Sequence, residues 1–136
     1  MVEIRRYQKP DFPEVKDILE KGGLYWEIPD NEKSLERKIQ NDPDSILIAT
    51  LDNKVVGTLF IIPDFMPFIF RLVVHPDFRN KGIGTELMCA GEDLLKRRGC
   101  NHVNILVASE DKKLQVFYER QGYEKGHTYT WMVKEF

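Results

Sequence analysis

The chain has 136 residues, of which 42% are hydrophobic and 31% are charged, and its formal net charge is -2. This length predicts one domain over residues 1–136 with a buried core of its own. The nearly balanced charge argues against a nucleic-acid or membrane surface, so we expect neither partner. The longest apolar stretch, residues 57–74, is interrupted by Pro63, Asp64 and Arg71, and no membrane span is expected.

Cysteine and histidine are sparse. Cys89 and Cys100 form no CxxC pair, and no signal peptide is recognised before the first predicted element, so we expect a cytoplasmic protein without a disulfide framework. His75, His102 and His127 are scattered along the chain. Zinc would need ligands at closer spacing, and no metal site is predicted.

Hydrophobic periodicity and turn residues divide the chain into alternating segments. Apolar residues three or four apart predict helices, as Leu35 and Ile39 do for residues 31–40. Alternating or β-rich runs between turn residues predict strands. In chain order we expect a strand (3–7), a helix (9–23), a helix (31–40), a hairpin of two strands (45–62), a strand (68–74), a helix that reaches about Arg98, a strand (102–108), a helix capped by Ser109 and ended by Gly122, and a strand (128–136).

This order of elements indicates an α/β domain. Hairpin connections come early, and strand–helix–strand units come late. We therefore expect a mixed central β-sheet that is flanked by helices.

Residues 78–88, FRNKGIGTELM, join a predicted strand to a predicted helix. They do not form a P-loop, because Lys81 precedes Gly82 instead of following it, and they are not a dinucleotide fingerprint, because Leu87 occupies the third glycine position. The remaining pattern, R-x-x-G-x-G, still favours an anion, because the first N–H groups of a helix lack internal partners and glycine lets a phosphate approach the backbone. The residues alone leave a glycine-rich turn without a ligand as the alternative.

Residues 73–88, VVHPDFRNKGIGTELM, resemble the acetyl-CoA signature R/Q-x-x-G-x-G/A of the GNAT superfamily of N-acetyltransferases. The resemblance extends to EIRRYQKPDFPEV, ILIATLDNKVVGTLF and VFYERQGYEKG, and so to nearly the whole chain. It implies a single GNAT domain over residues 1–136, of the small stand-alone type. Its fold would be α/β, with a mixed central sheet flanked by helices and with central strands that splay apart.

The resemblance also implies a co-substrate, acetyl-CoA, and direct transfer of its acetyl group to a primary amine, either a small molecule or a protein N-terminus. Backbone amides of the glycine-rich loop would hold the pyrophosphate, and the strand before the loop would pair with pantetheine. An amide from Val73 or Val74 would donate to the thioester carbonyl. The implied coenzyme A residues are Leu72, Val73, Val74, Arg79, Asn80, Lys81, Gly82, Ile83, Gly84 and Thr85.

Two further positions follow from the resemblance. Tyr118, in FYERQGY, stands where the family has the acid that protonates the leaving thiolate, and a phenol with a pKa of about 10 stays protonated at neutral pH. The alternative for Tyr118 is an aromatic side chain on the buried face of a helix. Asp111 stands where the family often has an asparagine that contacts pantetheine, although a carboxylate cannot donate as an amide does.

The sequence identifies neither the general base nor the acceptor. Strand 68–74 offers no glutamate or histidine as a base, which leaves Glu27, Asp64 and Glu110 as candidates and His75 as a turn residue. The connecting segments carry unusually apolar side chains, which have three interpretations: the wall of an acceptor pocket, a lid over the core, or a contact between two copies in a homodimer. These side chains are Tyr25, Trp26, Phe65, Met66 and Phe68.

We therefore expect an N-acetyltransferase. An acyl-CoA-binding module without catalysis is the alternative, because the strand lacks a base and Asp111 replaces the amide. Transfer of a longer acyl group is a third interpretation.

Overall fold

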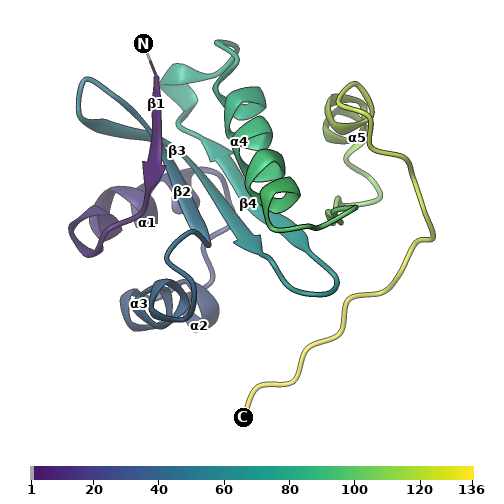
Figure 1. The fold of residues 1–136 in the computed structure, drawn as a ribbon, viewed down its shortest axis with the longest axis horizontal. Helices are drawn as coiled ribbons and strands as arrows, with labels where there is room; N and C mark the ends of the chain where they lie inside the picture. Colours follow the sequence, from purple (N-terminus) through teal and green to yellow (C-terminus); the bar gives the residue numbers. More distant parts are fainter. Residues whose placement is uncertain (1) are drawn as a thin grey trace. The chain divides into compact units, whose positions relative to one another are not determined.

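The computed structural model describes residues 2–136, which divide into two compact units, one up to Ile105 and one over Leu106–Phe136. Each unit is described by itself. The first unit contains every element except the last (Figure 1). In chain order the elements are β1 (Glu3–Arg6), η1 (Lys9–Asp11), α1 (Phe12–Lys21), α2 (Glu27–Asp30), α3 (Glu32–Asn41), β2 (Ile46–Leu51), β3 (Lys54–Ile62), β4 (Phe68–Val74), η2 (Pro76–Phe78), α4 (Ile83–Arg97) and α5 (Lys112–Glu119).

The first unit is built on a four-stranded sheet, counted over the described residues, in the order β1-β2-β3-β4. Each neighbouring pair is antiparallel. Asp52 and Asn53 turn β2 into β3 with φ angles of 50° and 62°, the left-handed backbone that a tight hairpin requires. The predicted α/β class is confirmed, as are the strands in residues 3–7, 45–62 and 68–74.

A mixed sheet was expected, but the strand pairs of the described residues are all antiparallel, because residues 102–108 do not form a strand. They share one parallel bridge with β4, at Phe68 and Asn104. Ile69 N donates to Asn104 O at 3.0 Å, and Asn104 N donates to Pro67 O at 2.8 Å. A β-rich run forms a strand only where a neighbouring strand supplies hydrogen bonds to it. The local sequence pattern does not show where that neighbour begins and ends.

The C-terminal prediction is also wrong in the second unit. Residues 128–136 form no strand in the described chain, and Tyr129 and Met132 are 80% and 85% exposed. Their alternating pattern has no partner strand there, and alternation alone does not create one. The helix between is present, but it is capped by Asp111, whose Oδ1 accepts from Leu114 N at 3.0 Å, instead of by Ser109.

Helices cover both faces of the sheet of the first unit (Figure 1). On one face, α1 and α3 contribute Val15, Ile18 and Leu35 to a core that includes Phe60 of β3. On the other face α4 packs closely, since a Cβ on Gly91 would lie 2.5 Å from Leu59 Cδ2. The glycine therefore sets how near α4 approaches β3.

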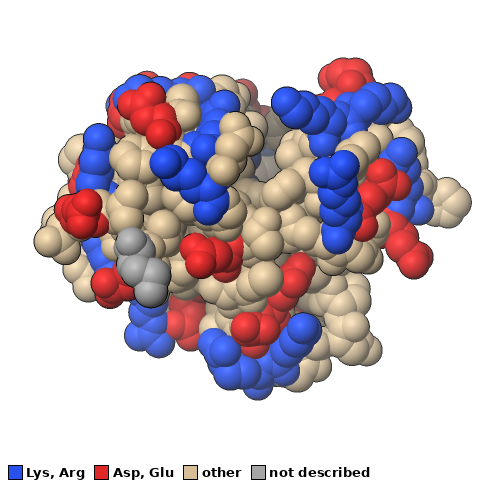
Figure 2. Space-filling model, turned by 90° about the horizontal axis from the view of Figure 1, so that it is seen from above, with Lys and Arg blue, Asp and Glu red and all other residues tan. Residues whose placement is uncertain are grey.

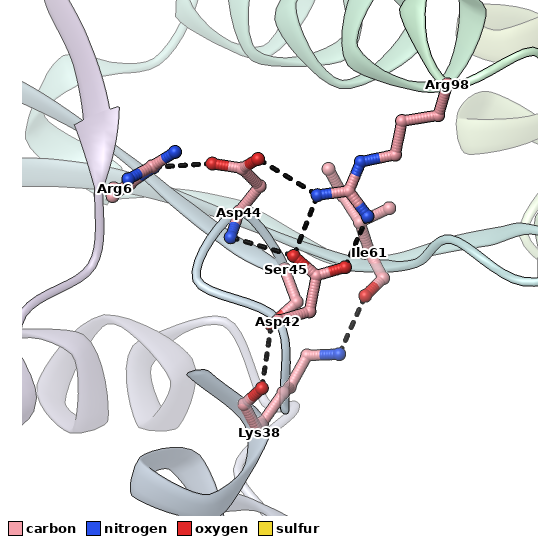
Figure 3. Close-up of polar contacts among 7 residues, drawn as sticks. All are labelled: Arg6, Lys38, Asp42, Asp44, Ser45, Ile61 and Arg98. Atoms are coloured by element: carbon pink, nitrogen blue, oxygen red, sulfur yellow. Dashed lines mark hydrogen bonds and ion pairs between the residues drawn. The ribbon is translucent and has the colours of Figure 1, made fainter. Parts of the chain in front are cut away.

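A polar cluster joins the C-terminal end of α4 to the loop between α3 and β2 (Figure 3). Arg98, at the end of α4, binds Asp42 and also Asp44 at 2.9 Å, and Asp44 binds Arg6 of β1 at 2.5 Å. Arg98 lowers the pKa of the Asp42 carboxyl. Nearby, Lys38 Nζ donates to Ile61 O at 2.7 Å. The cluster therefore connects β1, β3, α3 and α4.

Figure 2 shows both positive and negative side chains among the uncharged ones. Within residues 2–136 no helix is long and apolar enough to cross a membrane.

Candidate active site

Within the described residues of the first unit, one long side of β4 has no neighbouring strand along most of its length. β4 is the last strand of the sheet, so β3 occupies its other side. His75 N donates to Val56 O of β3 at 2.8 Å. Because successive peptide groups of a strand point in opposite directions, the N–H and C=O of Val74 point away from β3. The Val74 carbonyl meets Arg79 Nε there, at 3.1 Å.

A β-bulge interrupts β4. Thr58 pairs with Val73 and Phe60 pairs with Phe70, so Arg71 and Leu72 together face one residue of β3. Arg71 has φ 54°, and its carbonyl accepts from Thr58 Oγ1 at 2.9 Å. In a trans peptide the N–H opposes the C=O, so the Leu72 N–H points to the open side. Left-handed backbone at a non-glycine residue costs about 1–3 kcal/mol and persists where the surroundings hold it.

The side chain of Arg71 is held by Asp30 of α2. Arg71 Nε lies 3.1 Å from Asp30 Oδ2, and the Asp30 side chain is 2% exposed. This pair was not predicted from the sequence. The available signal was a single arginine within an otherwise apolar strand.

The segment after β4 turns sharply before α4 begins. The His75 side chain caps η2, as Nδ1 accepts from Asp77 N at 3.1 Å, in agreement with its predicted turn role. Asn80 and Gly82 then take left-handed backbone, with φ 63° and 80°. A Cβ on Gly82 would meet nothing within 4 Å, so φ is the reason for glycine there.

The N-terminus of α4 presents uncapped N–H groups. Gly82 is the N-cap and has no side chain that could accept from them. Ile83 is buried and anchors the helix, whereas Asn80, Lys81 and Thr85 are exposed around its end. Free N–H groups, a helix dipole and two basic side chains suit a phosphate-bearing ligand. The first unit therefore brings the predicted residues from Leu72 to Thr85 together in one continuous segment.

Tyr118 lies on α5 of the second unit and is buried, with 9% exposure. The rings of Phe117 and Tyr123 contact it edge to face, at centroid distances of 5.1 Å and 5.7 Å. Burial raises the pKa of Tyr118 to about 12. Its phenol is therefore protonated at neutral pH, as an acid must be before it donates.

The four carboxylates that the sequence suggested for the site have local hydrogen-bond partners. Glu27 Oε1 accepts from Tyr25 OH at 2.5 Å, and Asp64 Oδ1 accepts from Phe65 N at 2.7 Å. In the second unit, Glu110 accepts from Ser109 Oγ at 3.2 Å, and Asp111 caps α5. No carboxylate among these is distinguished as a general base, and no cluster of the described residues is arranged to hold a metal ion.

The residues predicted for the acceptor side are not gathered in one pocket. Tyr25 is half-buried and lines a cavity of about 330 Å³, together with Lys16, Glu27 and Glu32. Phe65 lies in the loop after β3 and is 90% exposed. The cavity has a mixed polar lining, in contrast to the apolar wall that the sequence suggested. Trp26, Met66 and Phe68 are not among its lining residues.

Comparison with known proteins covers most of the chain. The family described as "Acetyltransferase (GNAT) family" matches residues 2–123. An acetyltransferase of Sodalis glossinidius is 35% identical over 124 residues, which cover 90% of this chain and 87% of the relative.

Solved structures agree in fold at lower sequence identity. A PaiA N-acetyltransferase from Thermoplasma acidophilum in complex with coenzyme A superposes with a TM-score of 0.82 at 20% identity, over 94% of this chain and 92% of that one. Ard1 from Thermoplasma volcanium gives 0.81 at 20% identity, over 93% and 84%. The chain has an α/β fold and a helix that begins after Gly82, and the family match covers nearly its full length. It therefore belongs to the GNAT family of acetyltransferases.

Proposed function

We propose that this protein transfers an acetyl group from acetyl-CoA to a primary amine, with both substrates bound at once. The observation that carries the proposal is the junction of β4 with α4, where an open strand edge runs into an uncapped helix N-terminus. An extended amide-bearing chain that ends in a pyrophosphate suits this junction. Coenzyme A has that form, and the Thermoplasma acidophilum neighbour was solved in complex with it.

In this proposal the loop and the strand have separate roles. N–H groups of Ile83, Gly84 and Thr85, with Arg79 and Lys81 beside them, bind the pyrophosphate. Pantetheine follows β4 as an added strand, through the outward peptide groups of Leu72 and Val74. Of the two amides that the sequence suggested for the thioester carbonyl, the direction of the peptide groups favours Val74 over Val73.

The transfer itself is a direct attack on the thioester. The amine nitrogen forms a bond to the acetyl carbon, the carbon–sulfur bond breaks, and the thiolate leaves with the bonding electrons. An outward amide of β4 stabilises the oxyanion as charge builds on it. Tyr118 supplies a proton to the thiolate, and solvent takes the proton that the amine loses. The main contribution of the protein is to hold the two reactants in contact.

Two features leave a second function open. β4 carries no glutamate or histidine, and Asp111 uses its carboxylate as a helix cap. An acyl-CoA-binding module that does not turn over its ligand fits the same junction. The two functions differ in their response to an amine acceptor, either a small molecule or an N-terminal peptide, because only the transferase releases thiol when the acceptor is added.

The experiment is release of free thiol from acetyl-CoA in the presence of a panel of amines and N-terminal peptides. We expect thiol release that depends on the acceptor. Saturable binding of acetyl-CoA without thiol release for any acceptor class would support the binding module instead. Release with longer acyl thioesters but not with the acetyl thioester would reassign the donor.

A further inference from the structure

Asp30 is a buried carboxylate with a defined set of donors. It is 1% exposed and lies at the end of the four-residue helix α2. Trp26 N donates to Oδ2 at 2.9 Å. Arg71 approaches from β4, with Nε 3.1 Å and 3.3 Å from the two carboxylate oxygens and one terminal nitrogen 3.1 Å from Oδ2. A single carboxylate therefore joins the start of α2 to the bulge of β4.

Asp30 also fixes the segment that contains it. Its bond to Trp26 N closes one turn of α2. The next residue, Asn31, donates to Glu27 O at 2.8 Å and accepts from Ser34 N at 2.9 Å, so it closes α2 and begins α3. Residues 25–31, which include the acceptor-side candidates Tyr25 and Trp26, are therefore held to β4 as a unit.

Arg71 is an unfavourable choice for the backbone it adopts. Glycine or asparagine takes a φ of 54° more readily than arginine does. The conformation is held at two points, since Thr58 Oγ1 binds the Arg71 carbonyl and Asp30 binds the guanidinium. This conformation turns the following peptide so that the Leu72 N–H faces the open side of β4. The identity of the side chain is thus explained by its partner and not by the bulge.

We propose that Arg71 and Asp30 form a positioning pair, which ties residues 25–31 to the bulge that aims the outward amides of β4. The inference rests on the proposed function. In that reaction the pair keeps the acceptor side and the amides that face the thioester in one fixed arrangement. Arg71 and Asp30 act through Leu72 and Val74 and do not touch the reacting atoms themselves.

Two substitutions separate the pair from the bulge. Asp30→Asn keeps the shape and an oxygen for Trp26 N but removes the charge. Arg71→Gly keeps left-handed backbone accessible and removes the guanidinium. Asp11→Asn is a matched control, because Asp11 is also buried, accepts one backbone N–H (Gln8 N, 2.7 Å) and binds one arginine (Arg5, 2.8 Å and 2.9 Å).

We expect Asp30→Asn and Arg71→Gly each to lower kcat for acetyl transfer about tenfold or more, since small misplacements of reacting groups are costly. Asp11→Asn should change kcat less than about twofold in the same assay, because Asp11 binds Arg5 of β1, at the opposite edge of the sheet from β4. The double variant should be no slower than the slower single variant, because both changes remove one interaction. Losses that match the control, or losses that multiply in the double variant, would overturn the inference.

A second readout does not depend on turnover. In 1H–15N spectra of the full chain, Asp30→Asn should shift the amide signals of Leu72 and Val74, and Asp11→Asn should leave them in place. If the wild-type protein releases no thiol, the proposed function fails while this readout still tests the coupling. Unmoved Leu72 and Val74 signals in Asp30→Asn would refute the coupling whatever the activity.

Discussion

Single residues decide the backbone of the proposed site. Arg71, Asn80 and Gly82 all have positive φ within twelve positions of the chain. One turns a peptide of β4 toward the open side, and the other two bring the chain into α4. Most of the groups offered to a ligand are main-chain N–H and C=O, which is why ordinary apolar side chains suffice at Leu72 and Val74.

At Tyr118 we expect substitution by phenylalanine to lower kcat about tenfold or more, because the leaving thiolate loses its proton donor while the ring remains. Thermal stability should change little, since no side-chain hydrogen bond is needed for the ring contacts. Steady-state rates from neutral pH to about pH 10 test this. As the pKa of Tyr118 is raised to about 12, no alkaline loss from this group is expected in that range. Equal rates for Tyr118→Phe and wild type would remove the acid role.

At Lys38, burial lowers the pKa from 10.5 to about 8, while Nζ lies 5.3 Å from the centre of the Phe70 ring. Between these two values the unfolded chain binds more protons than the folded one, so the unfolding free energy should rise with pH across that window. Lys38→Met should flatten the rise, and Lys33→Met, at an exposed position of the same helix, should not. Urea unfolding at several pH values measures the unfolding free energy. The same rise of that free energy with pH in wild type and in Lys38→Met would contradict the prediction.

At the scale of elements, α4 lies against β3 through Gly91. A Cβ there would come within 2.5 Å of Leu59 Cδ2 and 3.3 Å of Ile69 Cδ1. We expect Gly91→Ala to lower the unfolding free energy by about 1–2 kcal/mol, because the cost of overpacking a buried contact is larger than the gain in helix propensity. Gly126→Ala, where nothing lies within 4 Å, is the control. Chemical denaturation compares the two, and a stabilised Gly91→Ala would show that the contact can relax.

The elements that the sequence predicted well are those whose signals are local. α1 ends at Lys21 with Gly22 as its C-cap, and α4 runs to Arg97 before Gly99 takes φ 85°, as the periodicity and the glycines indicated. The two strands predicted after α4 were wrong, because strand formation depends on a distant partner. The four-residue α2 is too short to produce a periodic pattern and was missed.

The same limit applies to the site. The glycine-rich loop was recognisable because its pattern is contiguous in sequence. The pair of Arg71 and Asp30 joins residues 41 positions apart, and neither residue belongs to a motif. Likewise, the role of Asp111 as a helix cap depends on where α5 begins, and its contact with pantetheine remains a prediction.

At the scale of the whole molecule, the proposed machinery is divided between two compact units. The first unit holds the strand edge, the glycine loop and the pair with α2. The second holds Tyr118 and Asp111. A single domain over residues 1–136 remains a prediction, and the proposed reaction requires Tyr118 to reach a thioester bound along β4.

The most direct test of the proposed site is calorimetric binding of coenzyme A to the full chain. We predict saturable binding by the wild-type protein, at least about a tenfold loss in Gly84→Glu, where a carboxylate would repel the pyrophosphate at the start of α4, and wild-type affinity in the control Gly126→Glu. Absence of binding by the wild-type protein, or equal affinity in Gly84→Glu, would contradict the assignment of this junction as the coenzyme A site.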